Sequence, residues 1–86
     1  MYTTRFCPFC IRARQLLDHK QVDYRDIPVD GDPQLRQEMM AASGRRTVPQ
    51  IWIGERHVGG FDDLAALERA GELDALLKSA GAVAAV

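Results

Sequence analysis

Two cysteines, Cys7 and Cys10, stand three positions apart near the start of the chain, with Pro8 and Phe9 between them. An apolar helical pattern begins at Pro8, which places the pair where a helix starts. Side chains three apart in a first helical turn are close enough for a disulfide to form and break. Unpaired backbone N–H groups and the helix dipole stabilise negative charge at that end. The spacing therefore predicts thiol–disulfide exchange with Cys7 as a low-pKa nucleophile.

The second cysteine is expected to have a different role. Cys10 lies one turn inside the helix, so we expect it to be more buried and to stay a thiol until Cys7 carries a partner. A low pKa gives Cys7 little net speed in attack, because a weaker base is also a weaker nucleophile. Its benefit is that Cys7 becomes a good leaving group when another thiol attacks.

Zinc binding is the structural alternative for a Cys-x-x-Cys pair. A zinc site of this kind needs two further ligands, and the only two histidines, His19 and His57, stand far apart along the chain. The positions of these histidines do not match the spacing of the ligands in a zinc site. We therefore expect no metal.

The composition is ordinary for a globular protein: 86 residues, 47% hydrophobic and 27% charged, which predicts a single domain over residues 1–86. A formal net charge of −1 gives no basic face for a phosphate backbone, so no nucleic-acid partner is expected. No apolar run approaches the ~20 residues of a membrane span, and no secretory segment is expected. Two cysteines three positions apart do not form the disulfide framework that is typical of small secreted proteins. A reducing, cytoplasmic location is therefore expected.

Hydrophobic periodicity predicts alternating strands and helices in the first half. We expect a short strand over residues 1–4, a helix from Pro8 to about Lys20, and a strand over residues 22–29. Asp32 and Pro33 signal the start of a second helix and Gly44 its end. In the first helix, core positions are expected at Cys10, Ala13 and Leu17, and water-facing positions at Arg12, Arg14, Gln15 and Asp18. The second helix is expected to bury Leu35, Met39 and Ala42.

The second half predicts a hairpin followed by two short helices. Strands over residues 50–53 and 56–58 flank a turn at Gly54 and Glu55. Asp62 is expected to cap a helix that ends near Ala70, and a last helix follows Gly71. The tail at 79–86 lacks periodicity and is expected to fray. The whole order predicts an α/β fold with a mixed four-stranded sheet flanked by helices, opening with a parallel βαβ unit.

Three motifs together closely resemble the glutaredoxin family. They are the Cys-Pro-Phe-Cys segment at 7–10, the Thr-Val-Pro-Gln-Ile-Trp-Ile segment at 47–53 and the His-Val-Gly-Gly-Phe-Asp-Asp-Leu segment at 57–64. The resemblance runs from Tyr2 to Lys78 and is strongest to small bacterial dithiol members of the third type. It implies a thioredoxin fold and a monomer that uses glutathione as co-substrate. The implied protein partners are glutathionylated or disulfide-bearing proteins, with ribonucleotide reductase as one candidate.

The resemblance also implies a glutathione site. A cis peptide bond before Pro49 would leave the backbone of Val48 to pair with the cysteine of glutathione. Asp62 and neighbouring backbone N–H groups would bind the γ-glutamyl end, and Arg45 or Arg46 would steady the glycine carboxylate. The candidate glutathione-binding residues are Arg5, Phe9, Arg45, Arg46, Thr47, Val48, Pro49, Gly60, Phe61 and Asp62.

Two residues depart from the pattern of the glutaredoxin family. Thr4 stands where the family often has lysine, so Arg5 is the candidate to supply that charge, and Phe9 replaces the usual tyrosine.

The sequence leaves two alternative functions open. One alternative is an electron donor reduced directly by a flavoprotein, which would not need the site around Asp62. The other is a carrier of an iron–sulfur cluster shared between two chains. Pro8 argues against the carrier, because cluster-bearing members mostly have glycine there.

Overall fold

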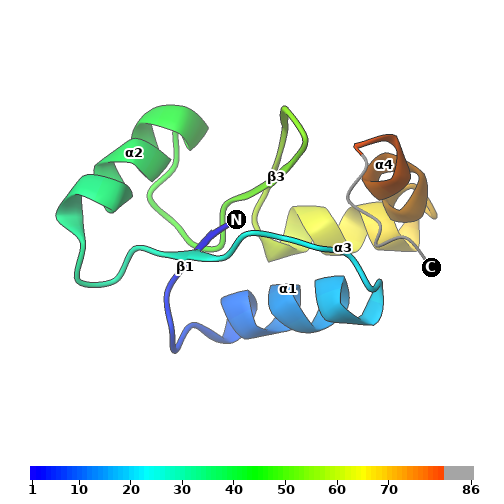
Figure 1. Ribbon diagram of the computed structural model, residues 1–86, viewed down its shortest axis with the longest axis horizontal. Coiled ribbons are helices and arrows are strands. Elements are labelled where there is room, and N and C mark those ends of the chain that lie inside the picture. The colour runs from blue at the N-terminus through cyan, green and yellow to red at the C-terminus, as the bar shows by residue number, and fades with distance from the viewer. Residues whose placement is uncertain (81–86) are drawn as a thin grey trace.

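The computed structural model describes residues 1–80, so residues 81–86, most of the tail that was expected to fray, lie outside the described residues. The elements are β1 (Tyr2–Thr3), α1 (Pro8–His19), β2 (Ile27–Pro28), α2 (Pro33–Ser43), β3 (Ile51–Ile53), β4 (Arg56–Gly59), α3 (Phe61–Arg69) and α4 (Leu73–Ser79). Their order and type confirm the predicted α/β arrangement, which is drawn in Figure 1.

The strands form two two-stranded ladders, β1-β2 and β3-β4. β1 pairs with β2 in parallel, and β3 pairs with β4 antiparallel. The two ladders are joined by an antiparallel bridge between Tyr2 and Gln50, whose N–H groups each donate to the other's carbonyl at 2.9 and 3.0 Å. The predicted mixed sheet is present in the form of these two small ladders, joined by a single bridge. β4 extends one residue beyond the predicted strand, to Gly59, which pairs with Ile51.

The strand predicted over residues 22–29 was wrong in length, since β2 covers only Ile27–Pro28. Its ladder begins where Ile27 N–H donates to the carbonyl of Met1 at 2.8 Å and continues where Val29 N–H donates to Thr3. Its partner β1 covers only Tyr2 and Thr3. Before Ile27, the carbonyl of Arg25 accepts a hydrogen bond from the Met1 amino group at 2.8 Å, but residues 23–26 form no strand.

The two long helices begin and end at the predicted signals. α1 starts with Pro8 after Cys7 and ends at His19. The Asp32 carboxylate caps α2 by accepting a hydrogen bond from Leu35 N–H at 3.1 Å, and Gly44 ends the helix with φ 72°. The stripe predicted for α2 is narrower than expected: Met39 is buried, but Ala42 is exposed. Figure 1 shows α2 set apart from the other helices, so only one side of it meets the sheet.

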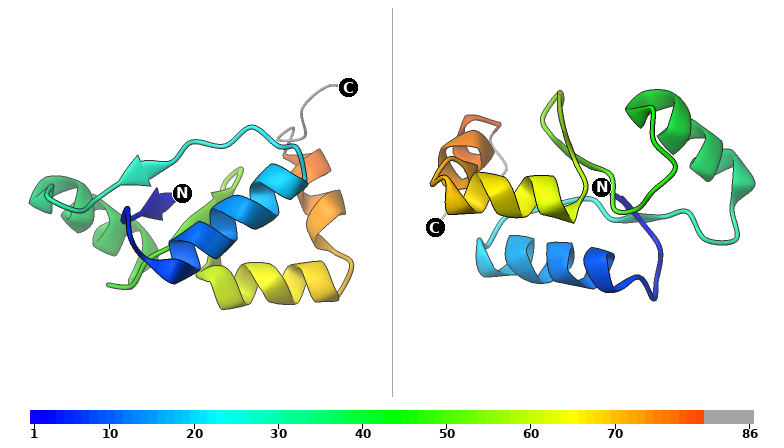
Figure 2. Two further views of the ribbon diagram at one scale, coloured as in Figure 1. Left: turned by 90° about the horizontal axis from the view of Figure 1, so that it is seen from below. Right: turned by 180° about the vertical axis from the view of Figure 1, so that it is seen from behind.

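The helices lie on both faces of the sheet. Figures 1 and 2 show α1 and α3 side by side on one face, with α2 on the other and α4 following α3. The main core fills the space between β3 and the helices α1, α3 and α4. Its buried members are Ala13, Leu17, Val22, Ile51, Ile53, Leu64, Leu73 and Leu77. This packing fixes the N-terminal ends of α1 and α3 relative to the loop that precedes β3.

Candidate active site

The two cysteines occupy different environments at the start of α1. Cys7 is the N-cap residue and is half-buried, with its Sγ 3.9 Å from the carbonyl oxygen of Val48. Cys10 is completely buried in the first turn, and both residues are free thiols. The predicted division into an accessible outer thiol and a buried inner thiol is present in the geometry.

The helix end lowers the pKa of Cys7. Burial by itself raises the pKa of this thiol, but hydrogen bonds from the N–H groups of Cys10 and Phe9 and from the Cys10 thiol lower it. The positive charge of Arg14 acts in the same direction, and the net pKa lies below the ordinary value. The N-cap position therefore favours the thiolate form without a neighbouring general base.

The inner thiol is shifted the other way. Burial, as the largest effect, acts together with the charge and the hydrogen bond of the adjacent Cys7 to raise the pKa of Cys10 to about 11. The backbone N–H of Thr4 and the charge of Arg14 oppose this rise. Cys10 is thus a protonated donor to the Cys7 thiolate as long as Cys7 is unreacted.

The prediction that Arg14 faces water was wrong. Its side chain is 23% exposed, and its Nε donates to Asp26 Oδ2 at 2.6 Å. Its Nη2 donates to the hydroxyl of Thr3 at 3.0 Å and to the carbonyl of Thr4 at 3.3 Å. Helical periodicity could not reveal this, because an arginine reaches partners that lie far away in the sequence.

A groove of about 280 Å³ lies beside the cysteine turn. Its lining residues are Phe9, Arg45, Thr47, Val48, Pro49, Gly60, Phe61, Asp62 and Asp63. The peptide bond between Val48 and Pro49 is cis, as the family resemblance implied. Within residues 1–80, no backbone hydrogen bond engages Val48. The groove therefore offers an N–H and a C=O without backbone partners next to the Cys7 sulfur.

Two of the predicted binding residues lie elsewhere. The Arg5 Nε is 3.5 Å from Asp30 Oδ2, and Arg5 does not line the groove. Arg46 does not line it either, and its carbonyl accepts a hydrogen bond from Arg36. Of the two arginines predicted as alternatives, Arg45 is the one at the groove. The structure thus brings together most of the predicted set without these two side chains.

The N-terminal end of α3 forms the far wall of the groove, and its capping differs from the prediction. The N-cap is Gly60, not Asp62, which is an exposed residue in the first turn. The cap is provided by Asp63, whose Oδ2 accepts from Gly60 N–H at 3.0 Å and from Arg45 Nη1 at 3.1 Å. The sequence signal was an acidic residue three positions after the N-cap, as in a capping box. Asp63 is the groove residue that the sequence reasoning missed.

Close packing at Gly59 supports this cap. Gly59 has φ 118°, which side-chain-bearing residues rarely adopt. A Cβ atom at this position would collide with the carboxylate of Asp63 and lie 2.9 Å from Arg45 Nη1. The pair formed by Asp63 and Arg45 can therefore sit against β4 only because residue 59 is glycine.

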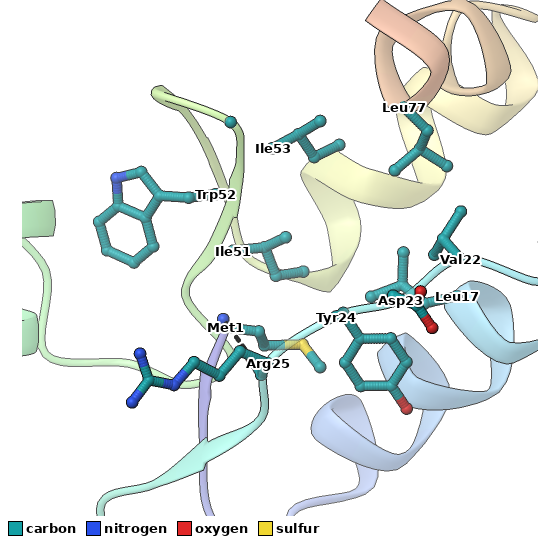
Figure 3. Close-up of a pocket in the computed structure, with 11 residues that line it drawn as sticks. Met1, Leu17, Val22, Asp23, Tyr24, Arg25, Ile51, Trp52, Ile53 and Leu77 are labelled. Atoms are coloured by element: carbon teal, nitrogen blue, oxygen red, sulfur yellow. Dashed lines mark hydrogen bonds between the residues drawn. The ribbon is translucent and has the colours of Figure 1, made fainter. Parts of the chain in front are cut away.

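A second pocket, of about 210 Å³, lies near the other end of α1. Figure 3 shows it enclosed mainly by apolar side chains, among them Leu17, Ile53 and Leu77. Asp23 and Arg25 are its charged lining residues, and neither cysteine takes part in it. This pocket has no nucleophile for thiol chemistry. The candidate active site is the groove beside Cys7.

Metal and membrane features can be assessed for residues 1–80. This part of the chain has no group of three or more His, Cys, Asp or Glu side chains placed to hold a metal ion. Nor does any helix in it have the length and apolar character needed to cross a membrane.

Comparison with known proteins gives consistent matches. The sequence model of the family described as glutaredoxin matches residues 1–58. The chain is 63% identical to a glutaredoxin of Pseudomonas aeruginosa over 92% of this chain and 94% of that protein. It is 51% identical to glutaredoxin 3 of Escherichia coli K12, over 91% and 94% of the two chains. A crystal structure of a buckwheat glutaredoxin–glutathione complex is similar in fold, with TM-score 0.89, 30% identity and coverage of 96% and 78%.

Proposed function

Because this chain belongs to the glutaredoxin family and is a thiol–disulfide oxidoreductase, we propose that glutathione is the thiol with which it exchanges. Its substrates in this proposal are glutathione mixed disulfides and protein disulfides, and Cys7 and Cys10 are its reacting residues. The observation that carries the proposal is the groove beside Cys7, whose polar groups match the charges of a small peptide.

The groove offers a complementary group for each part of glutathione. Glutathione carries a carboxylate at each end and an ammonium group beside one of them. The first N–H groups of α3 have no partners within the helix, so they suit the carboxylate next to the ammonium, with Asp62 facing the ammonium. Arg45 suits the carboxylate at the other end. The backbone of Val48 then pairs with the central cysteine and holds its sulfur near Cys7.

A glutathione mixed disulfide reacts through Cys7 alone. The Cys7 thiolate attacks the glutathione sulfur, the bond to the substrate sulfur breaks, and that sulfur leaves as a thiolate that takes a proton from water. A second glutathione thiolate then attacks the glutathione sulfur bound to Cys7. Oxidised glutathione forms, and Cys7 leaves as a thiolate. The lowered pKa of Cys7 favours this last departure.

A protein disulfide requires the second cysteine. Cys7 attacks one sulfur of the substrate, and the Cys10 thiolate then attacks Cys7. The substrate leaves fully reduced, and two molecules of glutathione reduce the Cys7–Cys10 disulfide. This cycle consumes reduced glutathione, as supplied in the cytoplasm. Apolar side chains near the nucleophile suit contact with a protein substrate: Phe6 is 87% exposed and Phe9 48%. Ribonucleotide reductase is one candidate partner of this kind.

The test is a comparison of two reductants. The probe is the mixed disulfide of glutathione and 2-mercaptoethanol, and the readout is NADPH consumption. We expect turnover with glutathione and glutathione reductase and none with thioredoxin reductase alone, and Cys7→Ser serves as the inactive control. Equal turnover with thioredoxin reductase and no response to glutathione concentration would contradict the proposal and favour direct reduction by a flavoprotein.

A further inference from the structure

Arg14 connects the base of the cysteine turn to the sheet. It lies one helical turn after Cys10, and its guanidinium binds the carboxylate of Asp26, the hydroxyl of Thr3 and the carbonyl of Thr4. Thr3 is fully buried and also donates its hydroxyl proton to Asp26. These contacts hold the arginine in one place although its charge could be solvated more fully elsewhere.

The same contacts link Arg14 to the sulfur of Cys10. Arg14 follows Cys10 by four residues in α1, a spacing that places the two side chains on the same side of the helix. The carbonyl of Thr4 accepts from Arg14, and the backbone of Thr4 acts to lower the pKa of Cys10. The Coulomb interaction between Arg14 and Cys10 is favourable when Cys10 is ionised.

Cys10 needs such a cation only in one step of the cycle. When Cys7 is in a mixed disulfide, its negative charge is gone and it can no longer accept the Cys10 proton. Cys10 must then become a thiolate inside the protein, where an ionised sulfur is costly unless a positive charge or donors compensate.

We propose that Arg14, held by Asp26 and Thr3, is a positioning residue for the resolving thiol and supplies the positive charge that lets Cys10 ionise and attack. The inference deepens the proposed function, on which it rests for the identity of the step. Cys10 releases its proton to water, its thiolate attacks the Cys7 sulfur, and the bond between Cys7 and the substrate sulfur breaks. The substrate sulfur leaves as a thiolate and is protonated, while Cys7 and Cys10 become oxidised to a disulfide.

The groups around Arg14 predict opposite effects for two substitutions. Cys7 and Arg14 are the charged groups acting on Cys10, and Asp26 and Tyr24 are titratable groups acting on Arg14. Tyr24 in turn donates to Asp18. Arg14→Gln removes the cation near Cys10. Asp26→Asn keeps the cation and removes the anion that partly neutralises it.

The experiment measures the pH dependence of Cys10 alkylation by iodoacetamide in full-length protein carrying Cys7→Ser, where Cys10 is the only thiol. Adding Arg14→Gln is expected to move the midpoint upward by roughly half a pH unit or more, and adding Asp26→Asn to move it downward. Arg14→Lys keeps the charge and should restore most of the parent midpoint. Arg12→Gln removes the same charge from an exposed position of the same helix and should change the midpoint far less.

A structural role for Arg14 would give a different pattern. Loosening of the fold would expose Cys10 and shift the Arg14→Gln and Asp26→Asn midpoints in the same direction, and that result would overturn the proposal. An unchanged midpoint in both variants would also overturn it. Asp26→Asn keeps the arginine and an amide oxygen that can accept from it, so it tests the same electrostatic effect if Arg14→Gln does not fold. The measurement uses no glutathione, so its outcome is independent of whether glutathione is the exchanging thiol.

Discussion

Two helix ends border the same groove and treat their unpaired N–H groups differently. α1 begins at Cys7 with no acidic residue in its first turn and no side-chain cap. α3 begins at Gly60 with Asp62 and Asp63 in its first turn, and Asp63 accepts the Gly60 N–H. Phe9 from the first end and Phe61 from the second both line the groove.

The difference shows how one physical feature serves two purposes. The positive end of a helix stabilises whichever anion is nearest. At α1, that anion is the thiolate of Cys7, and no carboxylate of the same turn competes with it. At α3, the carboxylate of Asp63 accepts one of the unpaired N–H groups, that of Gly60. The same carboxylate also binds Arg45 and so fixes the position of that side chain. In the proposed function, the first end serves the reaction and the second forms a stable wall of the binding groove.

The largest effect is expected from the cysteines of the first end. Cys7→Ser should abolish exchange with every substrate, because no other accessible thiol stands at a helix end in residues 1–80. Cys10→Ser should keep the reduction of glutathione mixed disulfides and lose most reduction of protein disulfides. The measurement is the turnover of one substrate of each class by both variants. Equal loss of mixed-disulfide turnover in the two variants would contradict a pathway through Cys7 alone.

Removing the charge that faces the ligand should have the next largest effect. Asp62 is exposed and does not cap α3, so Asp62→Asn changes the groove without removing a cap. Loss of a charge-assisted hydrogen bond of ~1.5–3 kcal/mol should lower kcat/KM for glutathione by about 10- to 100-fold. The free energy of unfolding should stay nearly unchanged. A glutathione dependence equal to that of the parent would exclude a ligand role for Asp62.

A carboxylate placed at the first end should make it more like the second. Phe9→Asp adds a negative charge in the first turn of α1, close to the thiolate of Cys7. The midpoint of Cys7 alkylation should then rise by about 0.5–1 pH unit, because the two like charges repel. Phe9→Asn, with the same shape and no charge, is the matched control. The comparison would fail if both variants shifted the midpoint equally.

The smallest expected effect is on stability at the second end. Asp63→Asn weakens the cap of α3 and the contact with Arg45, and should cost about 1 kcal/mol of unfolding free energy at pH 7. The Gly60 N–H, together with Arg45, holds the pKa of Asp63 below its ordinary value. A depressed pKa means that the charged form stabilises the fold above the unfolded pKa and that this contribution disappears as pH falls through the folded pKa.

Chemical denaturation of the parent and Asp63→Asn at several pH values tests this. The difference in unfolding free energy between the two proteins should be constant near neutral pH and shrink as the solution becomes more acidic than about pH 4. A difference that does not change with pH would show that the charge of Asp63 contributes nothing to the cap.

Short-range patterns in the sequence predicted the elements and the cysteine turn well. The signals at Pro8, Asp32 and Gly44 gave the limits of two helices, because capping depends on residues within one turn. The spacing of the cysteines gave an outer and an inner thiol for the same reason. The predicted strand at 22–29 was too long, since a strand ends where its partner ends and that partner lies elsewhere in the chain.

What the sequence determined by itself is therefore the α/β order, the cysteine pair at the start of α1 and most residues of the groove. Only the tertiary structure decided which charged side chains meet. Arg14 turned from solvent to Asp26, Arg45 rather than Arg46 reached the groove, and Asp63 capped α3 in place of Asp62. The physical reason is reach: a helix start depends on the few residues around it, whereas the position of a long charged side chain depends on partners brought near by the packing of distant elements.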